Sequence, residues 1–328
     1  YQLARMIFND PSSTPEQTAQ ALERLTKAAE AGQDCAQYAL GKIYRDGQGV
    51  EKDIQKAVAL FTLAATKENS FAAFALGKLY LAGDAALPRD PAAALKWLTY
   101  AAELGNQFAQ YRLGKLLLKG DDGIPKDVIT AIRWLTAAAK QENGYAEYAL
   151  ALVYLTGEDA PKDSVKALSL LKRSAGRGNQ FAQYRLGKLL LQGEDAPKDV
   201  KAAIRWLTAA AEQGNQYAQY ALGKLYLLGK EVPKDRSSAI KWFQLAADQG
   251  NEYAQYFLKH MDDRLGQPPV AAVISLFHHL ANIFQEQNQP PPSGGVRVAV
   301  DRKLLRKIKA KKIAQGHKAD DHEPEMQL

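Results

Sequence analysis

The chain has 328 residues, of which 46% are hydrophobic and 24% are charged, and its formal net charge is +7. This composition is close to that of an average soluble protein, which excludes a disordered or collagen-like chain. Because the sequence has no apolar run of about 18 residues and no basic and apolar start typical of a signal peptide, neither a membrane span nor secretion is expected.

The positive charge is concentrated at the C-terminal end. From Val296 onward nine basic residues stand against five acidic ones, which leaves a charge of +4 there. The rest of the chain is nearly balanced, so only the end suggests nucleic acid or an acidic partner. The single cysteine, Cys35, excludes a disulfide within the chain, and we expect a cytoplasmic location.

The first segment, residues 1–35, is expected to be a partial or degenerate repeat. Residues 1–4 already have the pattern that occurs in the middle of the repeats further along the chain. We therefore expect the chain to be a fragment of a larger bacterial protein.

Six full repeats and the start of a seventh are predicted over residues 36–258. The phrase A-Q-Y-x-L-G-K-x-x-L recurs from Ala109, Ala182 and Ala218, and looser copies begin at Ala36, Ala72 and Ala146. Their starts are 36 or 37 residues apart. This period is typical of solenoids built from helix pairs, because one pair cannot bury its apolar face without neighbours.

Each repeat is predicted to contain two helices, here called helix A and helix B. In the unit that begins at Ala218, apolar residues at three- and four-residue spacing predict helix A, and the stretch 229–235, with its glycine and proline, ends it. A second apolar stripe predicts helix B up to Gly250.

Four columns of equivalent residues have structural interpretations. Glycines that follow helix A are expected to take positive φ, and aspartates before helix B are expected to cap it. A glycine inside helix A is expected to allow close approach of helix B. The tryptophans, which share one position of helix B, are expected to lie in the core: Trp97, Trp134, Trp206 and Trp242.

The pattern A-x-Y-x-L-G-x-x-Y-x-x-G-x-x-V-x-x-D-x-x-K-A-x-x-W-x-x-x-A-A-x-x-G resembles the Sel-one-like repeat, a relative of the tetratricopeptide repeat. The resemblance implies an all-α fold, a right-handed α-solenoid of tandem helix-turn-helix repeats, which serves as a protein-protein interaction scaffold. It also implies that helix A lines the binding surface. We expect a monomeric array with no enzymatic activity, no cofactor and no bound metal.

Helix A carries a column of lysines and a column of aromatic residues four positions earlier. A surface with regularly spaced cations and aromatic rings suits an acidic peptide, and it could also follow a phosphate backbone. Solvated lysines and structural tyrosines are the alternative interpretation. The candidate partner-binding residues are Tyr38, Lys42, Lys78, Tyr111, Arg112, Lys115, Tyr184, Arg185, Lys188, Tyr220 and Lys224.

The C-terminal part is predicted to contain a capping helix within residues 259–288 and a linker with a basic tail over 289–328. An apolar stripe predicts the helix, and Pro290–Gly295 cannot be helical. The tail is either solvated or in contact with nucleic-acid phosphates. Its candidate residues are Arg297, Arg302, Lys303, Arg306, Lys307, Lys309, Lys311 and Lys312.

The tail also resembles the repeat-bearing C-terminal region of mobilisation relaxases of Firmicutes. This resemblance implies an alternative function, an accessory region that contacts DNA or partners in conjugative transfer. No catalytic motif of a relaxase occurs in the chain, so no active-site residue is predicted.

Overall fold

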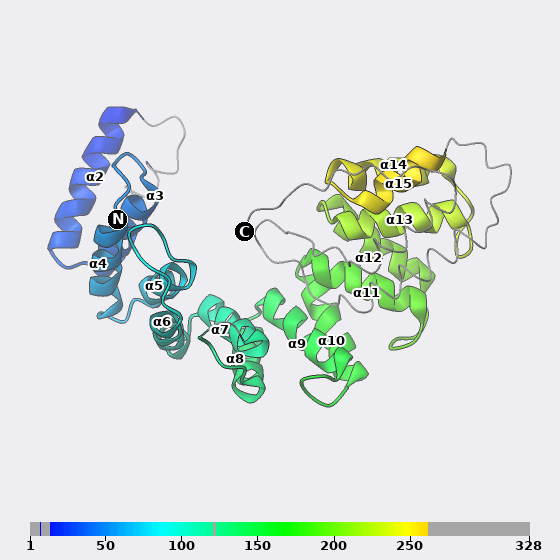
Figure 1. The fold of residues 1–328 in the computed structure, drawn as a ribbon, viewed down its shortest axis with the longest axis horizontal. Helices are drawn as coiled ribbons and strands as arrows, with labels where there is room; N and C mark the ends of the chain where they lie inside the picture. Colours follow the sequence, from blue (N-terminus) through cyan, green and yellow to red (C-terminus); the bar gives the residue numbers. More distant parts are fainter. Residues whose placement is uncertain (1–6, 8–13, 121–122, 262–328) are drawn as a thin grey trace, which may run out of the picture. The chain divides into compact units, whose positions relative to one another are not determined.

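The computed structural model describes residues 7, 14–120 and 123–261, which form α-helices joined by short turns. Successive helices are antiparallel neighbours, and each pair packs against the next along the chain (Figure 1). The helices are α2 (Pro15–Glu30), α3 (Asp34–Asp46), α4 (Ile54–Ala65), α5 (Ser70–Ala82), α6 (Pro91–Glu103), α7 (Gln107–Lys119), α8 (Val128–Lys140), α9 (Gly144–Thr156), α10 (Ser164–Gly176), α11 (Gln180–Gln192), α12 (Val200–Glu212), α13 (Gln216–Leu228), α14 (Arg236–Asp248) and α15 (Glu252–Met261).

The predicted all-α repeat solenoid is confirmed. Odd-numbered helices from α3 onward are helix A of a repeat, and even-numbered helices are helix B, so α2 is the helix B of the first, partial repeat. Over the described ranges, no helix is long and apolar enough to cross a bilayer. The predicted capping helix beyond residue 261 and the basic tail lie outside the described residues.

Helix boundaries follow the predicted capping residues. The Asp199 side chain accepts a hydrogen bond from the Ala202 backbone N–H at 2.9 Å, and the equivalent aspartates cap the other B helices in the same way. At the end of helix A, Gly193 has a φ of 77°, and the five equivalent glycines also have positive φ. Both predictions are confirmed.

A second set of caps was not predicted. Helix A begins at an asparagine whose side chain accepts backbone N–H bonds, as Asn179 does from Phe181 and Ala182 at 3.0 and 3.1 Å. The equivalent caps are Asn69, Asn106, Asn143, Asn215 and Asn251. Helix A of the first full repeat, α3, begins at Gln33 without such a cap, and the other helix starts described above are fixed by a side chain that replaces a missing intrahelical partner.

The core lies between helix A and helix B of each repeat. A Cβ atom added at Gly187 of α11 would lie 2.7 Å from the Leu207 side chain and 3.0 Å from the Ala203 carbonyl oxygen of α12. This contact is too short for any side chain, so the predicted close approach is confirmed. In the fourth full repeat, the fully buried Ala151 takes the place of this glycine.

The tryptophans lie less deep than we predicted. They are half-buried and pack on the edge of the core, whereas the next residue in each B helix is fully buried. One residue turns a helix by about 100°, which directs that next side chain at helix A. The fully buried column of large side chains on the B helices is Phe61, Leu98, Leu135, Leu171, Leu207 and Phe243.

Candidate functional site

Aromatic rings connect the A helices of neighbouring repeats. One ring lies in the middle of each A helix, and it contacts a ring near the start of the next A helix. The centroid separations range from 5.9 Å for Tyr111 and Tyr145 to 6.4 Å for Phe74 and Phe108. The other pairs are Tyr38 with Phe71, Tyr148 with Phe181, Tyr184 with Tyr217, and Tyr220 with Tyr253. We call these twelve residues the aromatic ladder.

The two halves of the aromatic ladder differ in exposure. The rings in mid-helix are half-buried, and burial raises the pKa of Tyr111 and of Tyr184 to about 12, so these hydroxyls stay neutral at physiological pH. Of the second set, Phe71, Phe108 and Tyr145 are each about half exposed. The second set therefore supplies ring surface that a partner can reach.

The predicted lysine column lies beside the ladder. Lys78 and Lys115 place their Nζ atoms 5.8 and 5.9 Å from the ring centroids of Phe74 and Tyr111, one helical turn earlier. Lys42, Lys78 and Lys115 are exposed, and Lys188 and Lys224 are half-buried. The predicted residues thus share one face of the A helices, which we call the helix A face.

Positive charges on this face repel one another. Burial, followed by Arg112 and Lys119, lowers the pKa of Lys115. Burial and Arg185 lower the pKa of Lys188 in the same way. Burial and two further lysines lower the pKa of Lys224. An anion placed beside Lys115 or Lys188 would relieve both the repulsion and the loss of hydration.

The first full repeat differs, because it already contains an acid. Arg45 donates a hydrogen bond to Asp46 at 2.7 Å, and this bond, with help from Lys42 and Lys78, lowers the pKa of Asp46. The positive charge at this end is thus partly neutralised. The lysines whose pKa is lowered lie further along, on α7, α11 and α13.

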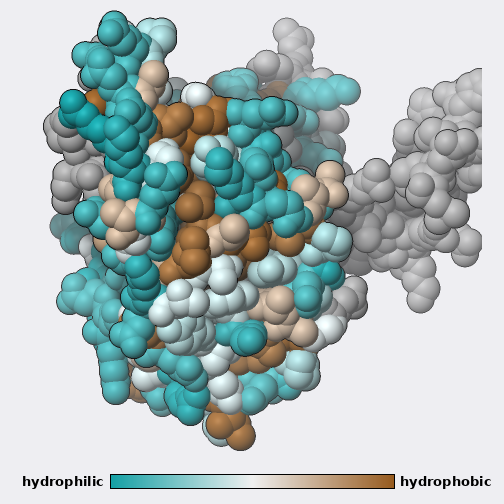
Figure 2. Space-filling model, turned by 90° about the vertical axis from the view of Figure 1, so that its left-hand side faces the viewer, coloured by the Kyte–Doolittle hydropathy of each residue, from teal (hydrophilic) through white to brown (hydrophobic). Residues whose placement is uncertain are grey.

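The surface near the N-terminal helices is not uniformly polar. Seen from the side of α2 and α4, apolar residues form a band between hydrophilic flanks (Figure 2). Leu63 of α4 and Phe71 of α5 are each 52% exposed. Exposed apolar area of this kind is found at protein-binding surfaces.

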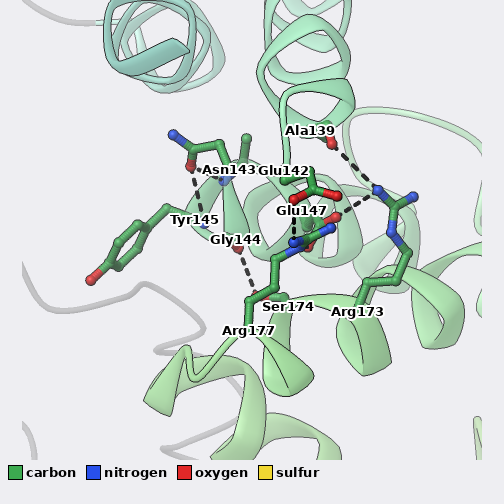
Figure 3. Close-up of polar contacts among 10 residues, drawn as sticks. Ala139, Glu142, Asn143, Gly144, Tyr145, Glu147, Arg173, Ser174 and Arg177 are labelled. Carbon is green, nitrogen blue, oxygen red and sulfur yellow. Dashed lines mark hydrogen bonds and ion pairs between the residues drawn. The ribbon is translucent and has the colours of Figure 1, made fainter.

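The fourth full repeat contains a buried ion-pair cluster (Figure 3). Glu147 of α9 is fully buried, and its carboxylate lies 2.7 Å from Nη2 of Arg173 and 3.3 Å from Nε of Arg177, both on α10. Arg173 also donates to the Ala139 carbonyl oxygen at 3.3 Å. Next to them the buried Ser174 donates to the Gly144 carbonyl oxygen at 2.6 Å.

Other repeats place neutral groups at the same positions. Gln183 donates to the Ala175 carbonyl oxygen at 3.1 Å, and its own Oε1 accepts from Gln213 at 2.8 Å. Gln110 with Gln141 and Gln219 with Gln249 repeat this pair. Glu147 cannot donate, so Arg173 binds the carbonyl oxygen in its place, while Arg177 stands where the second glutamine would be.

A family model for the Sel1 repeat matches residues 1–33, 36–69, 70–106, 107–143, 144–179, 180–215 and 216–251. The chain belongs to the Sel1 repeat family. Sel1 arrays are a type of protein-interaction scaffold and are typically non-catalytic. No curated protein matches the sequence, and the predicted resemblance to relaxases is not shown by these comparisons.

Two solved structures share both sequence and fold with the chain. One is c5321, described as a protective antigen of uropathogenic Escherichia coli with an SLR fold; it is 34% identical with a TM-score of 0.69, over 81% of this chain and 57% of that one. The other is a Sel1 repeat protein of Oxalobacter formigenes, 33% identical with a TM-score of 0.68, over 80% of this chain and 75% of that one. The chain thus spans little more than half the length of the first.

Some other charges of these Sel1 repeats form ion pairs between neighbouring turns. A lysine before helix B pairs with an acid in the next turn, as in Lys162 with Asp195 at 2.8 Å and Lys198 with Glu231 at 2.8 Å. These pairs are exposed, so each contributes at most about 1 kcal/mol. Within residues 7, 14–120 and 123–261, no group of acids, histidines and cysteines could hold a metal ion.

Proposed function

We propose that this Sel1 array binds an extended acidic segment of a partner protein across its helix A face. The observation that carries the proposal is the lysine column on one face of the A helices, where burial and other cations lower the pKa of Lys115 and of Lys188. Exposed rings lie beside it. Glutamate or aspartate side chains would place negative charge opposite these lysines, and apolar residues would cover the rings.

A protein segment fits this face better than nucleic acid does. The rings that reach the surface pack against rings of the preceding repeat, which supports a role in holding the repeats together rather than in stacking successive bases. The relaxase alternative depends on residues beyond 261, and it is not carried by any described contact. Duplex and single-stranded DNA therefore enter the test as competitors.

The proposal is tested by a charge reversal on the helix A face. The triple variant Lys115→Glu/Lys188→Glu/Lys224→Glu is expected to weaken binding of a labelled, glutamate-rich peptide by at least about tenfold, which corresponds to about 1.4 kcal/mol. Each change removes an attraction and adds a repulsion. Fluorescence anisotropy at about 150 mM salt measures it, because long-range charge effects are largely screened there.

The matched control changes the same net charge on helix B. Lys96, Lys172 and Lys201 are exposed on B helices, and their triple change to glutamate is expected to alter affinity by less than about threefold. Equal weakening by both triple variants would show that only net charge matters and would overturn the proposal. Binding of DNA in preference to the peptide would replace the acidic partner by a nucleic acid.

A further inference from the structure

Two A helices carry the same cationic sequence. Residues 107–118 of α7 and 180–191 of α11 are identical, so Arg112 and Lys115 recur as Arg185 and Lys188. The two helices make equivalent contacts with their asparagine caps and with the next ring of the aromatic ladder. The chain therefore presents the same cationic surface twice.

The A helix between them has lost this charge. In α9, Ala149 takes the place of the arginine and Leu152 that of the lysine, and Thr156 stands where α7 has Lys119. Leu152 is half-buried, so part of its side chain faces solvent. Glu147, the acidic residue of α9, is fully buried and paired with arginines of α10. The exposed face of α9 is therefore apolar and uncharged.

The three helices are direct neighbours on the helix A face. Tyr111 of α7 contacts Tyr145 of α9 at a centroid separation of 5.9 Å, and Tyr148 of α9 contacts Phe181 of α11 at 6.3 Å. Tyr145 is 55% exposed, which adds ring surface to the uncharged helix. A segment that crosses this face thus meets cations, then an apolar strip, then the same cations again.

We infer that the partner segment is bipartite, with two short acidic clusters separated by a stretch that contains an apolar residue. One cluster lies on Arg112 and Lys115, the other on Arg185 and Lys188, and the apolar residue lies against Leu152 and Tyr145. This inference rests on the proposed function and specifies its ligand. Packed helices are about 10 Å apart, so the clusters are separated by roughly 20 Å, or about six residues of extended chain.

An unbroken acidic run is a poorer ligand by the same reasoning. An acid placed over α9 would lose water to the apolar strip without meeting a cation. The two clusters share one arginine and one lysine, although α7 adds Lys119 and on α11 Arg185 attracts Asp195. Spacing, rather than total charge, is then the property that the array selects.

The test compares synthetic peptides of equal composition and charge. Each has six glutamates, one leucine and glycine–serine spacers, and the glutamates form either one run or two clusters whose centres are about six or about twelve residues apart. We expect the six-residue spacing to bind at least about fivefold more tightly than the other two. Leu152→Lys should reduce this preference by making the face continuous, and Leu152→Met should keep it.

The outcomes separate the two claims. Equal affinities for all three peptides, still weakened by the helix A triple variant, would contradict the bipartite ligand and leave the acidic-segment proposal standing. No binding of any peptide would contradict the proposed function itself. Circular dichroism checks that Leu152→Lys keeps its helix content, and the peptide series on the unchanged protein gives the answer if it does not.

Discussion

Replacing Arg173 and Arg177 together by alanine is expected to destabilise the fourth repeat by about 3–5 kcal/mol. The two changes would leave the Glu147 carboxylate fully buried without a counter-charge. They would also remove the Arg173 donor from the Ala139 carbonyl oxygen, which would keep only the bond from the Glu142 backbone N–H. A buried charge that loses its partners is among the most destabilising defects a core can contain, so this variant should be the most damaging change on α10.

Removing the acid is expected to cost less. In Glu147→Gln the arginine side chains, which are 50% and 33% exposed, can turn toward solvent. The triple variant Glu147→Gln/Arg173→Ala/Arg177→Gln should recover most of the stability, because it recreates the pair that Gln183 and Gln213 form one repeat later. Urea denaturation with hydrogen exchange on α9 and α10 measures these differences. A double alanine variant as stable as the triple variant would contradict this interpretation.

Phe243→Ala is expected to destabilise the last full repeat by about 3–5 kcal/mol. Phe243 is fully buried, its ring contacts Tyr220 and Phe257 at centroid separations of 5.8 and 5.2 Å, and it lies against Gly223. Alanine would leave a cavity between α13, α14 and α15. Local exchange of amide hydrogens in these three helices reports the loss, because repeats unfold partly independently.

The control replaces the same ring by leucine. Four of the equivalent positions already hold leucine, including Leu207 against Gly187, so the geometry accepts this side chain. Phe243→Leu should therefore cost less than about 1.5 kcal/mol. Equal losses for alanine and leucine would show that the aromatic contacts, rather than filling of the space, hold the last repeat.

Capping and close packing could be predicted from the sequence, since they depend on residues near in the chain. An aspartate before an apolar stripe and a glycine after one have local meanings, and Asp199 and Gly193 behave accordingly. The burial of the tryptophans was harder to predict from the sequence. The neighbour of each tryptophan was the buried residue, and a shift of one position changes which side chain faces helix A.

The ion-pair cluster could have been found in the sequence but was missed. Two positions differ together in this repeat: Glu147 and Arg177 stand where three other repeats have a pair of hydrogen-bonded glutamines. The second full repeat has Ala73 and Leu104 at the same places, an apolar version of the pair. Comparing repeats position by position, and noting correlated exceptions, would have predicted the contact.

The candidate site was predicted as a set of residues but not as an electrostatic arrangement. The sequence shows that Lys115 and Lys188 recur on helix A, and the structure adds that burial and other cations lower the pKa of both. It also assigns the tyrosines a structural part, since the rings of Tyr111 and Tyr184 contact rings of the next repeat. Ring contacts between repeats depend on packing that the sequence of one repeat does not contain.

The central claim is that an acidic segment lies on the helix A face, and zero-length coupling of lysine amines to peptide carboxylates tests it most directly. A carboxylate must touch an amine to be coupled, and mass spectrometry identifies the lysine. We predict coupling of a glutamate-rich peptide at Lys115, Lys188 and Lys224. Coupling spread equally over Lys96, Lys172 and Lys201 on the B helices, or confined to them, would contradict the account.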